Sequence, residues 1–239
     1  TKFIKNSNVV INLKTLWHEK PISFEKGIYD FNDLLVKQIN EHDNKKLLIY
    51  FSGLGITRDS NSNRSKIIAK TEENILKNMR NGIIIRPGLV FGVNDNFIKK
   101  LIPLFKLSPI IPLFGNGNTK FQPVFVDDVA KAIETIIAKN NLESKIYELH
   151  GNDTFTYKFL YSFLAKSLGL SRIFLPFPFF LAKILVYLIQ KISTKLITLE
   201  QLKLFEHDNL PSNKTGTFRN LDIKPQNILQ TIKIIVDKY

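Results

Sequence analysis

The 239-residue sequence contains no cysteine, one methionine and one tryptophan. The lack of cysteine excludes a disulfide framework, a thiolate zinc site and a cysteine nucleophile. The histidines lack the spacing of metal ligands, so we predict no metal site. They are His18, His42, His150 and His207. Apolar residues make up 44% and charged residues 23%, which is ordinary for a globular protein and excludes a disordered or collagen-like chain.

Acidic side chains are scarce relative to basic ones, at 21 against 34, and the net charge is +13. Such an excess suggests nucleic acid or an anionic membrane as a partner. Only six of the 34 basic residues are arginine, the side chain that recognises phosphate with two parallel donors. Plentiful Lys, Asn, Ile and Phe are typical of a genome biased toward A and T. We therefore expect no specific nucleic-acid partner.

The first part of the chain alternates short apolar runs with helical periodicity. This alternation predicts βαβ units and a parallel sheet. The expected strands are 8–13, 47–51, 83–86, 124–126 and 145–149. The expected helices are 23–40, 65–79, 96–105 and a further helix up to residue 139. Asp127 or Asp128 is expected to cap the last of these, since a carboxylate satisfies free backbone donors.

After residue 150 the pattern becomes mostly helical. Helices are expected over 156–168, 178–192, 198–206 and 225–238. Thr198 and Gln201 have the spacing of a capping box. The fold class is therefore α/β, with a partial Rossmann-type parallel sheet in residues 1–150. A small, mostly helical C-terminal domain follows in residues 151–239.

One apolar stretch, residues 174–192, stands out in the second part. Pro178 leaves it too short for the roughly 20 residues that span a bilayer. A buried helix is one interpretation. A helix that lies on a membrane surface or on a partner protein is the other.

Two elements of an ordinary nicotinamide-dependent dehydrogenase are missing. The eleven glycines include no Gly-x-Gly-x-x-Gly, the turn that holds a pyrophosphate. Ser52 ends a predicted strand, and Lys66 and Lys70 follow on a predicted helix, as in a Ser and Tyr-x-x-x-Lys arrangement. However, no tyrosine occurs between Tyr50 and Tyr147. The general acid/base of such a site is therefore absent.

Three stretches carry a family resemblance. The first is Arg-Pro-Gly-Leu-Val-Phe-Gly at 86–92, the second Ser-Pro-Ile-Ile-Pro-Leu-Phe-Gly at 108–115, and the third Phe-Gln-Pro-Val-Phe-Val-Asp-Asp-Val-Ala at 121–130. Together they resemble the atypical short-chain dehydrogenase/reductases, the NAD-dependent epimerase/dehydratase superfamily. The likeness is greatest to the branch with the dinucleotide-binding accessory subunit of respiratory complex I. Leu-Pro-Phe-Pro at 175–178 also fits that branch.

The resemblance implies roles for particular residues. The catalytic positions would be Ser52 and Lys70, with Lys66 as the alternative lysine. A basic residue near Lys120, together with Gln122, would meet the substrate. The residues expected to contact NADP(H) or NAD(H) are Asn12, Leu13, Ser52, Lys70, Pro87, Leu89 and Val90.

The resemblance also implies a missing part. The family begins with a glycine-rich strand, turn and helix, and this sequence begins near the fourth strand of the family. We therefore expect an N-terminally truncated fragment, in which residues 9–13 form an apolar sheet edge. Only the complete protein is expected to hold the cofactor, and the choice between NADH and NADPH depends on the missing part.

Three functions remain open at this point. A noncatalytic NAD(P)-binding accessory or assembly component of complex I agrees with the absent tyrosine and the basic charge. An active NAD(P)-dependent oxidoreductase or sugar-nucleotide epimerase/dehydratase would use Ser52 with a lysine or a substrate group. An anion or membrane binder without cofactor is the third. The expected location is the cytoplasm or the cytoplasmic face of the inner membrane in a bacterium, and the matrix side in a mitochondrion.

Overall fold

The computed structural model describes residues 2–43, 45–93, 95–139, 142–192 and 197–238. Within them the chain forms two compact units, each assembled from segments distant in the sequence. The sheet unit contains residues 2–87, 132–149 and 212–222. The aromatic unit contains residues 88–131, 150–211 and 223–238. Residues 88–131, which the sequence analysis placed in the first domain, thus cluster with the second.

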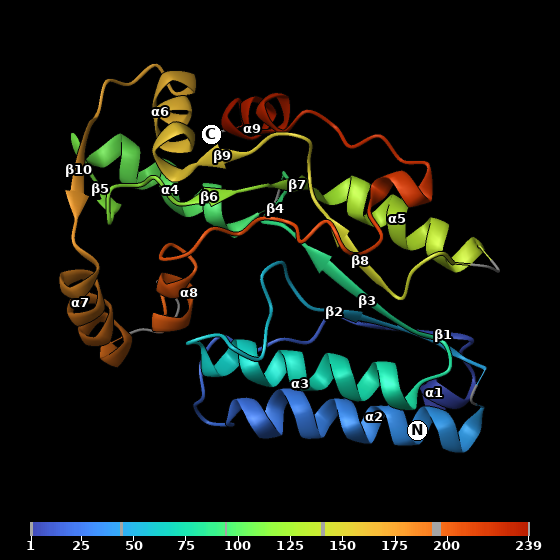
Figure 1. Ribbon diagram of the computed structural model, residues 1–239. Coiled ribbons are helices and arrows are strands. Elements are labelled where there is room, and N and C mark those ends of the chain that lie inside the picture. Colours follow the sequence, from blue (N-terminus) through green and yellow to red (C-terminus); the bar gives the residue numbers. More distant parts are fainter. Residues whose placement is uncertain (1, 44, 94, 140–141, 193–196, 239) are drawn as a thin grey trace. The chain divides into compact units, whose positions relative to one another are not determined.

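The sheet unit is built on four parallel strands. Across the sheet (Figure 1) they are β1 (Val9–Asn12), β2 (Leu47–Phe51), β3 (Gly82–Pro87) and β8 (Ile146–Leu149). All four come from the apolar runs that predicted them, so the parallel sheet is confirmed. Leu48, Ile49 and Ile84 are fully buried, as central strands of a parallel sheet are. β1 lies at one edge, as expected.

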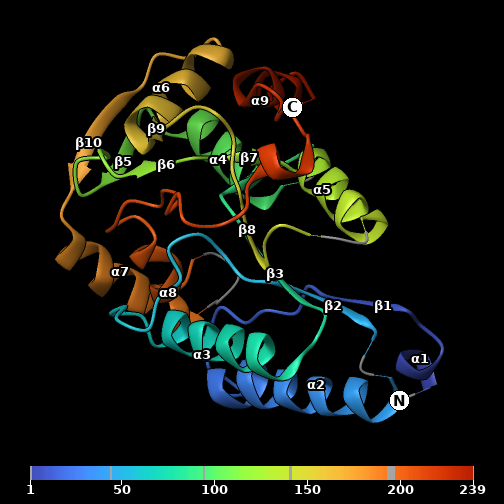
Figure 2. The ribbon, with the colours of Figure 1, turned by 45° about the vertical axis from the view of Figure 1, so that its right-hand side comes forward.

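Helices cover the sheet within this unit. They are α1 (Lys2–Lys5), the π-helical η1 (Glu25–Asp30), α2 (Phe31–His42), α3 (Asn63–Asn78) and the 3₁₀-helical η2 (Phe218–Leu221). η1 runs without a break into α2, so the helix predicted over 23–40 begins with π-helical geometry. α2 and α3 lie side by side in Figures 1 and 2. Ile39 of α2 and Ile75 of α3 are buried in the core they share with β2 and β3.

The aromatic unit contains three two-stranded sheets. Its strands are β4 (Val90–Phe91), β5 (Ile110–Phe114), β6 (Lys120–Phe121), β7 (Val124–Phe125), β9 (Phe155–Thr156) and β10 (Ile173–Phe177). β10 pairs with β5 and β4 with β7, both parallel, while β6 pairs with β9 antiparallel. The sequence analysis missed β10 because Pro176 interrupts its pattern. Proline is tolerated there because a two-stranded ribbon has open edges that require no donor.

The remaining helices confirm those expected over 96–139 and after residue 150. They are α4 (Asn96–Leu107), α5 (Val126–Ala138), α6 (Tyr157–Ser167), α7 (Phe179–Ile192), α8 (Leu199–Lys203) and α9 (Ile228–Val236). The capping box of Thr198 and Gln201 is present at α8. The expected cap of α5 was wrong, because Asp127 and Asp128 lie inside its first turn. Asp128 is buried and accepts the backbone and side-chain N–H groups of Gln226 at 2.7 and 3.1 Å.

Aromatic rings form much of the core of the second unit. Tyr157 packs against Phe121 and Phe205 with ring centroids 4.6 and 4.3 Å away. Phe105 meets Tyr161 edge to face at 5.6 Å. Such contacts add to the free energy gained by burying the rings. The aromatic unit therefore has a hydrophobic core of its own.

A buried ion-pair network ties the sheet to α3. The Arg86 guanidinium, on β3, donates through Nε (3.0 Å) and a terminal nitrogen to Glu72 of α3. Its other terminal nitrogen lies 3.4 Å from the Glu148 carboxylate of β8. Glu148 also accepts the Ser212 N–H at 2.6 Å and the Ser212 hydroxyl at 3.0 Å. Glu72 and Glu148 are both buried, so Arg86 supplies the positive charge that makes their burial tolerable.

We predict that Arg86→Met lowers the free energy of unfolding by about 3–5 kcal/mol, because it leaves two buried carboxylates without a counter-charge. Urea unfolding at neutral pH measures the change. Arg58→Met is the matched control, since Arg58 forms a similar two-point pair with Glu73 on the exposed surface. That change should cost less than about 1 kcal/mol. Equal losses in both variants would contradict the assigned role of Arg86.

Candidate functional site

The carboxyl ends of the parallel strands form the first candidate site, within the sheet unit. Ligands of open α/β sheets bind outside this edge. β2 ends at Phe51, and the next residue, Ser52, donates its N–H to the Ile85 carbonyl of β3 at 2.8 Å. The Leu54 N–H reaches the Pro87 carbonyl at 3.1 Å. The structure therefore brings two predicted site residues, Ser52 and Pro87, to neighbouring positions on this edge.

Asn12 ends β1 at the same edge, but its side chain is engaged inside the unit. Its amide donates to Asn32 Oδ1 at 2.7 Å, and its own Oδ1 accepts the Lys14 N–H at 3.0 Å. Asn32 in turn donates to the Ile28 carbonyl at 2.7 Å. Asn12 thus fixes the chain that leaves β1. The next residue, Leu13, is exposed.

The Ser52 hydroxyl is buried and has no hydrogen-bond partner within the part of the chain that the structure describes. A buried hydroxyl without a partner costs free energy. Ser52 therefore offers a donor and acceptor that a ligand at the strand ends would satisfy. This orphaned group fits a bound dinucleotide, which presents amide and hydroxyl groups.

Lys70, one of the two predicted lysines, is engaged with another element. Its Nζ lies 2.6 Å from the Glu25 carboxylate of η1 and 3.7 Å from the centre of the Tyr29 ring. The hydrogen bond that Lys70 donates to the Glu25 carboxylate raises the pKa of Lys70, so its ammonium is held charged. Lys66, one turn earlier on α3, is exposed. The contacts of Lys70 are thus those of an ion pair between α3 and η1.

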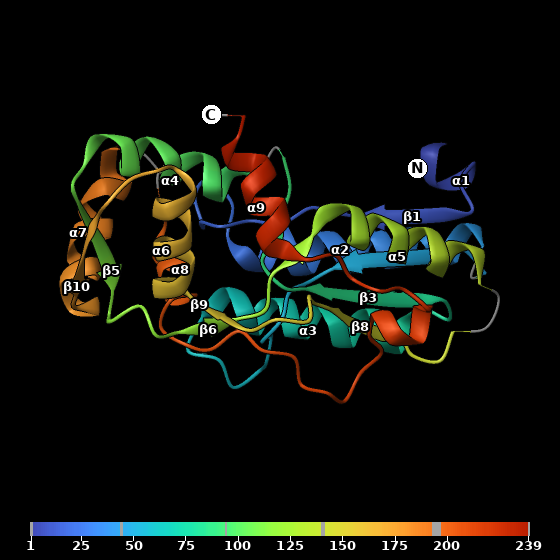
Figure 3. The same cartoon turned by 90° about the horizontal axis from the view of Figure 1, so that it is seen from above.

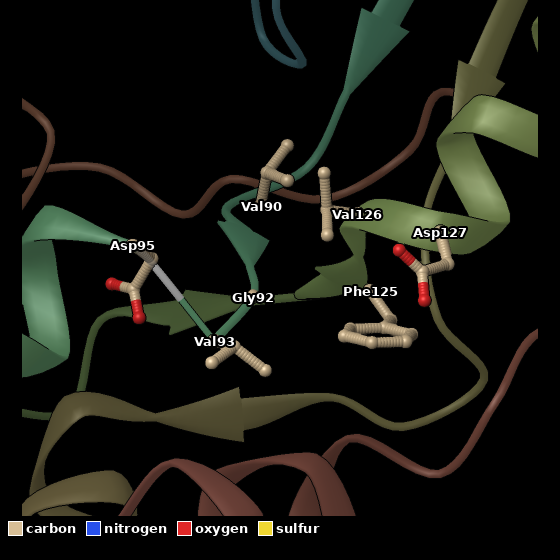
Figure 4. Close-up of a pocket in the computed structure, with 7 residues that line it drawn as sticks. All are labelled: Val90, Gly92, Val93, Asp95, Phe125, Val126 and Asp127. Atoms are coloured by element: carbon tan, nitrogen blue, oxygen red, sulfur yellow. The ribbon is translucent and has the colours of Figure 1, made fainter. Parts of the chain in front are cut away.

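A cavity in the aromatic unit is a second, separate candidate site. It measures about 590 Å³ and lies where β4 and β7 lead into α4 and α5 (Figure 4). A Cβ on Gly92 would come within 2.7 Å of Val126, so glycine lets the two segments approach closely. The lining residues are Val90, Gly92, Val93, Asp95, Phe125, Val126 and Asp127.

Asp95 is the residue of this cavity that the sequence analysis missed. Its Oδ1 caps α4 by accepting the N–H groups of Phe97 and Ile98 at 2.8 and 2.9 Å. Its Oδ2 is buried without a hydrogen-bond partner among the described residues. Burial raises the pKa of Asp95 above its ordinary value. The spacing to Phe97 and Ile98 reveals the cap, but the burial depends on β7 and α5, about 30 residues later in the sequence.

The cavity combines an apolar wall with two carboxyl groups. Val90, Val93 and Phe125 give the wall, and Figure 4 shows Asp95 and Asp127 on opposite sides of it. Such a cavity suits a largely apolar ring or a polyol whose hydroxyls donate to the carboxyl groups. Of the two predicted residues in this region, Val90 lines the cavity. Leu89 packs its side chain on the aromatic core, and its carbonyl accepts the Val124 N–H at 3.0 Å.

The predicted substrate residues, Lys120 and Gln122, lie on and just after β6. The Lys120 N–H donates to Asp208 Oδ1 at 2.7 Å, and its carbonyl accepts the Asn209 N–H at 2.8 Å. The Gln122 N–H donates to the Asn209 carbonyl at 3.3 Å. The backbone of β6 is therefore paired, while the side chain of Lys120 is exposed. In the part of the chain that the structure describes, no group of His, Asp or Glu is arranged to hold a metal ion.

Comparison with protein families matches residues 56–149 to the NAD dependent epimerase/dehydratase family. This part of the chain is similar to an NAD-dependent epimerase/dehydratase domain. The match begins after Ser52 and ends with β8, so it covers α3, β3 and the cavity segments. It confirms the family that the sequence resembles.

Curated relatives of the chain belong to respiratory complex I. The chain is 30% identical over 233 residues to the mitochondrial NADH dehydrogenase [ubiquinone] 1 alpha subcomplex subunit 9 of Arabidopsis thaliana, covering 93% of this chain and 58% of that protein. The mouse protein of the same name is 28% identical over 185 residues, with 74% and 46% covered. The chain thus spans about half the length of these relatives.

Two solved structures with the same fold are named as a UDP-glucose epimerase and a dTDP-glucose dehydratase. A UDP-glucose 4-epimerase from Thermotoga maritima, solved with UDP-glucose, has a TM-score of 0.69 at 14% identity and covers 99% of this chain and 80% of that one. A dTDP-glucose 4,6-dehydratase from Bacillus anthracis in complex with NAD has a TM-score of 0.68 at 16% identity, with 97% and 72% covered. At these identities the likeness establishes the Rossmann-like fold alone.

We predict that the stability of the Asp95→Asn variant increases relative to that of the unmodified protein as pH rises. Because burial raises the pKa of Asp95, the folded state binds the proton more tightly than the unfolded state. In the unmodified protein, this bound proton makes its full contribution to the free energy of unfolding below the ordinary carboxyl pKa. The contribution is lost as pH rises through the raised pKa. Asparagine keeps the cap without the charge. The measurement is the free energy of unfolding of both proteins from acid to neutral pH.

Asp127→Asn is the control for this experiment, because Asp127 faces the same cavity but is exposed. That change should alter the free energy of unfolding by less than about 1 kcal/mol. A difference between Asp95→Asn and the unmodified protein that stays constant over the whole pH range would contradict a raised pKa of Asp95.

Proposed function

We propose that the protein binds an NAD(P) dinucleotide without catalysing a reaction on it, as an accessory or assembly component of respiratory complex I. In this proposal the dinucleotide is structural and stabilises the folded protein by mass action. The related complex I subunits from plant and mouse support the assignment to that assembly.

A catalytic tyrosine would have to stand four positions before Lys66 or Lys70, and neither position holds a tyrosine. Ser62 stands four positions before Lys66, and its Oγ accepts the Ser65 N–H at 3.1 Å as the N-cap of α3. Lys66, which is exposed, stands four positions before Lys70. Lys70 does contact a tyrosine, Tyr29, but its ammonium lies over the ring face. A cation over the ring does not position the phenol hydroxyl for proton transfer.

Binding of a dinucleotide is supported by the unpartnered Ser52 hydroxyl at the carboxyl edge of the sheet. When bound, a nicotinamide supplies a hydride donor or acceptor, but no tyrosine stands four positions before Lys66 or Lys70 to move the accompanying proton. Ser52 would hydrogen-bond the bound group, and Pro87 would shape its surroundings. Ser52 follows β2 and Pro87 ends β3, and the carboxyl edge of a parallel α/β sheet is where ligands bind, which supports the proposal.

The related complex I subunits are named as mitochondrial proteins. We accordingly propose the matrix side of the mitochondrial inner membrane as the location. Association can be tested in the organism that encodes the protein. Mitochondrial complexes are separated by native electrophoresis, and the protein should migrate with NADH dehydrogenase activity. Deletion of its gene should reduce assembled complex I, and normal assembly without it would contradict the proposed role.

We predict that Ser52→Ala weakens NADH or NADPH binding by about 3- to 10-fold, the usual contribution of one hydrogen bond. Without cofactor the variant should be at least as stable as the unmodified protein, because the orphaned hydroxyl is gone. Titration calorimetry and thermal unfolding on the complete natural polypeptide measure the two effects. Lys66→Ala and Lys70→Ala, compared in the same titration, show which lysine contacts the dinucleotide.

A turnover assay distinguishes the proposed noncatalytic role from that of an active enzyme. The complete polypeptide should convert neither UDP-glucose nor dTDP-glucose in the presence of NAD. Steady turnover that Ser52→Ala abolishes would overturn the noncatalytic assignment. Dinucleotide binding that is equal in Ser52→Ala and the unmodified protein would instead remove Ser52 from the binding site.

A further inference from the structure

One helix of the aromatic unit buries only a narrow strip of its apolar surface. Of the 14 residues of α7, Ala182 and Val186 are buried against Leu202 of α8. Six other apolar side chains of the helix are between 40% and 65% exposed. They are Phe180, Leu181, Ile184, Leu185, Tyr187 and Leu188. A helix that is apolar nearly all round normally lies in a core or against a membrane.

The ribbon of β5 and β10 continues this exposed surface. Ile173 pairs with Ile110, and Leu175 pairs with Pro112, and all four residues are exposed. Phe177, at the end of β10, has its carbonyl bonded to the Gly115 N–H, and Phe179 of α7 lies against Gly115. Figures 1 and 3 both show the ribbon and α7 at the same end of the aromatic unit. We call the exposed residues of the ribbon and α7 the apolar flank.

The charge of the apolar flank is of one sign. Residues 173–192 contain Lys183 and Lys191 and no acidic residue. Lys183 pairs with Glu206 of the neighbouring segment at 2.7 Å. Lys191 lies over the ring of Tyr187, with its Nζ 4.8 Å from the ring centre. An apolar face with a tyrosine and lysines at its border is the composition of helices that lie in a membrane interface.

The length of α7 decides between a helix that crosses a membrane and one that lies on its surface. In the described ranges, no helix combines the length and apolar character that a membrane span requires. The 14 residues of α7 extend about 21 Å at 1.5 Å per residue, against about 30 Å of hydrocarbon. A helix of this length with one buried strip fits the interface plane, where its apolar side chains enter the acyl boundary and its lysines reach the headgroups.

We propose that the apolar flank docks on the surface of an anionic lipid bilayer. The lysines and the absence of acidic residues between 173 and 192 favour anionic over neutral headgroups. The exposed Phe, Leu, Ile and Tyr side chains of the short α7 helix are those that enter the acyl boundary of a bilayer. The docking is independent of the proposed dinucleotide site and of the assignment to complex I. It would hold the aromatic unit against a membrane without insertion of a span.

The test is sedimentation of the full chain with vesicles of phosphatidylcholine and phosphatidylglycerol, compared with vesicles of phosphatidylcholine alone. Binding should be at least about 10-fold stronger to the anionic vesicles and should weaken as salt is added. The double variant Phe180→Asp/Ile184→Asp should lower anionic-vesicle binding by at least about 10-fold, because two anchoring side chains become charged.

Phe159→Asp/Ile234→Asp is the matched control. It changes a phenylalanine and an isoleucine on α6 and α9 of the same unit, which are 44% and 54% exposed against 65% and 57% for Phe180 and Ile184. Its vesicle binding should stay within about twofold of the unmodified protein. Circular dichroism checks that both variants fold. If the test variant does not fold, Leu188→Asp alone replaces it.

Hydrogen exchange of α7 in the unmodified protein gives a second readout. The amides of α7 should exchange more slowly when anionic vesicles are added. Protection that is already complete without vesicles would mean that another part of the chain covers the flank, which overturns the proposal. So would a dimer in sedimentation equilibrium that Phe180→Asp/Ile184→Asp dissociates, or vesicle binding that the test and control variants lose equally.

Discussion

A single guanidinium holds together the part of the sheet from which the candidate dinucleotide site is built. Arg86 stands one residue before the end of β3 and joins Glu72 of α3 to Glu148 of β8. Two buried carboxylates share one positive charge, and the N–H and hydroxyl of Ser212 supply further donors. Burying charge is tolerable only with such pairing. The pairing fixes the carboxyl end of β3, and Ser52 is fixed with it through its hydrogen bond to Ile85.

The parallel sheet and most helices could be predicted because their signals are local. The runs 47–51 and 83–86 are too apolar for anything but buried strands, and the helices repeat their apolar residues every three or four positions. β10 could not be predicted, because its strand geometry comes from pairing with β5, about 60 residues earlier, and Pro176 hides it. Asp128 shows the same limit. Its position suggests a helix cap, but its partner is Gln226, about 100 residues later.

The positions of the candidate residues could be predicted where they depend on strand ends and could not where they depend on side-chain partners. Ser52 and Pro87 follow from the ends of β2 and β3, which sequence patterns locate well. Lys70 follows only from a spacing, and a spacing does not say which charged neighbour lies across the helix. Glu25, in a π-helical turn, holds the Lys70 ammonium instead. Asp95 required knowledge that residues 90–95 and 125–127 close around one cavity.

Ser52 bears on the binding of a ligand, whereas the missing tyrosine bears on catalysis, so the two functions can be considered separately. A buried hydroxyl without a partner destabilises the folded protein, and a ligand that accepts or donates there removes the cost. If the proposed dinucleotide binds there, its binding and the folding stability are coupled through Ser52, whether or not a reaction takes place. Proton transfer needs a second group of suitable pKa near the substrate. The chain places a helix cap at Ser62 and a charged, carboxylate-bound ammonium at Lys70, so the physical chemistry of the edge suits a dinucleotide held as a structural element.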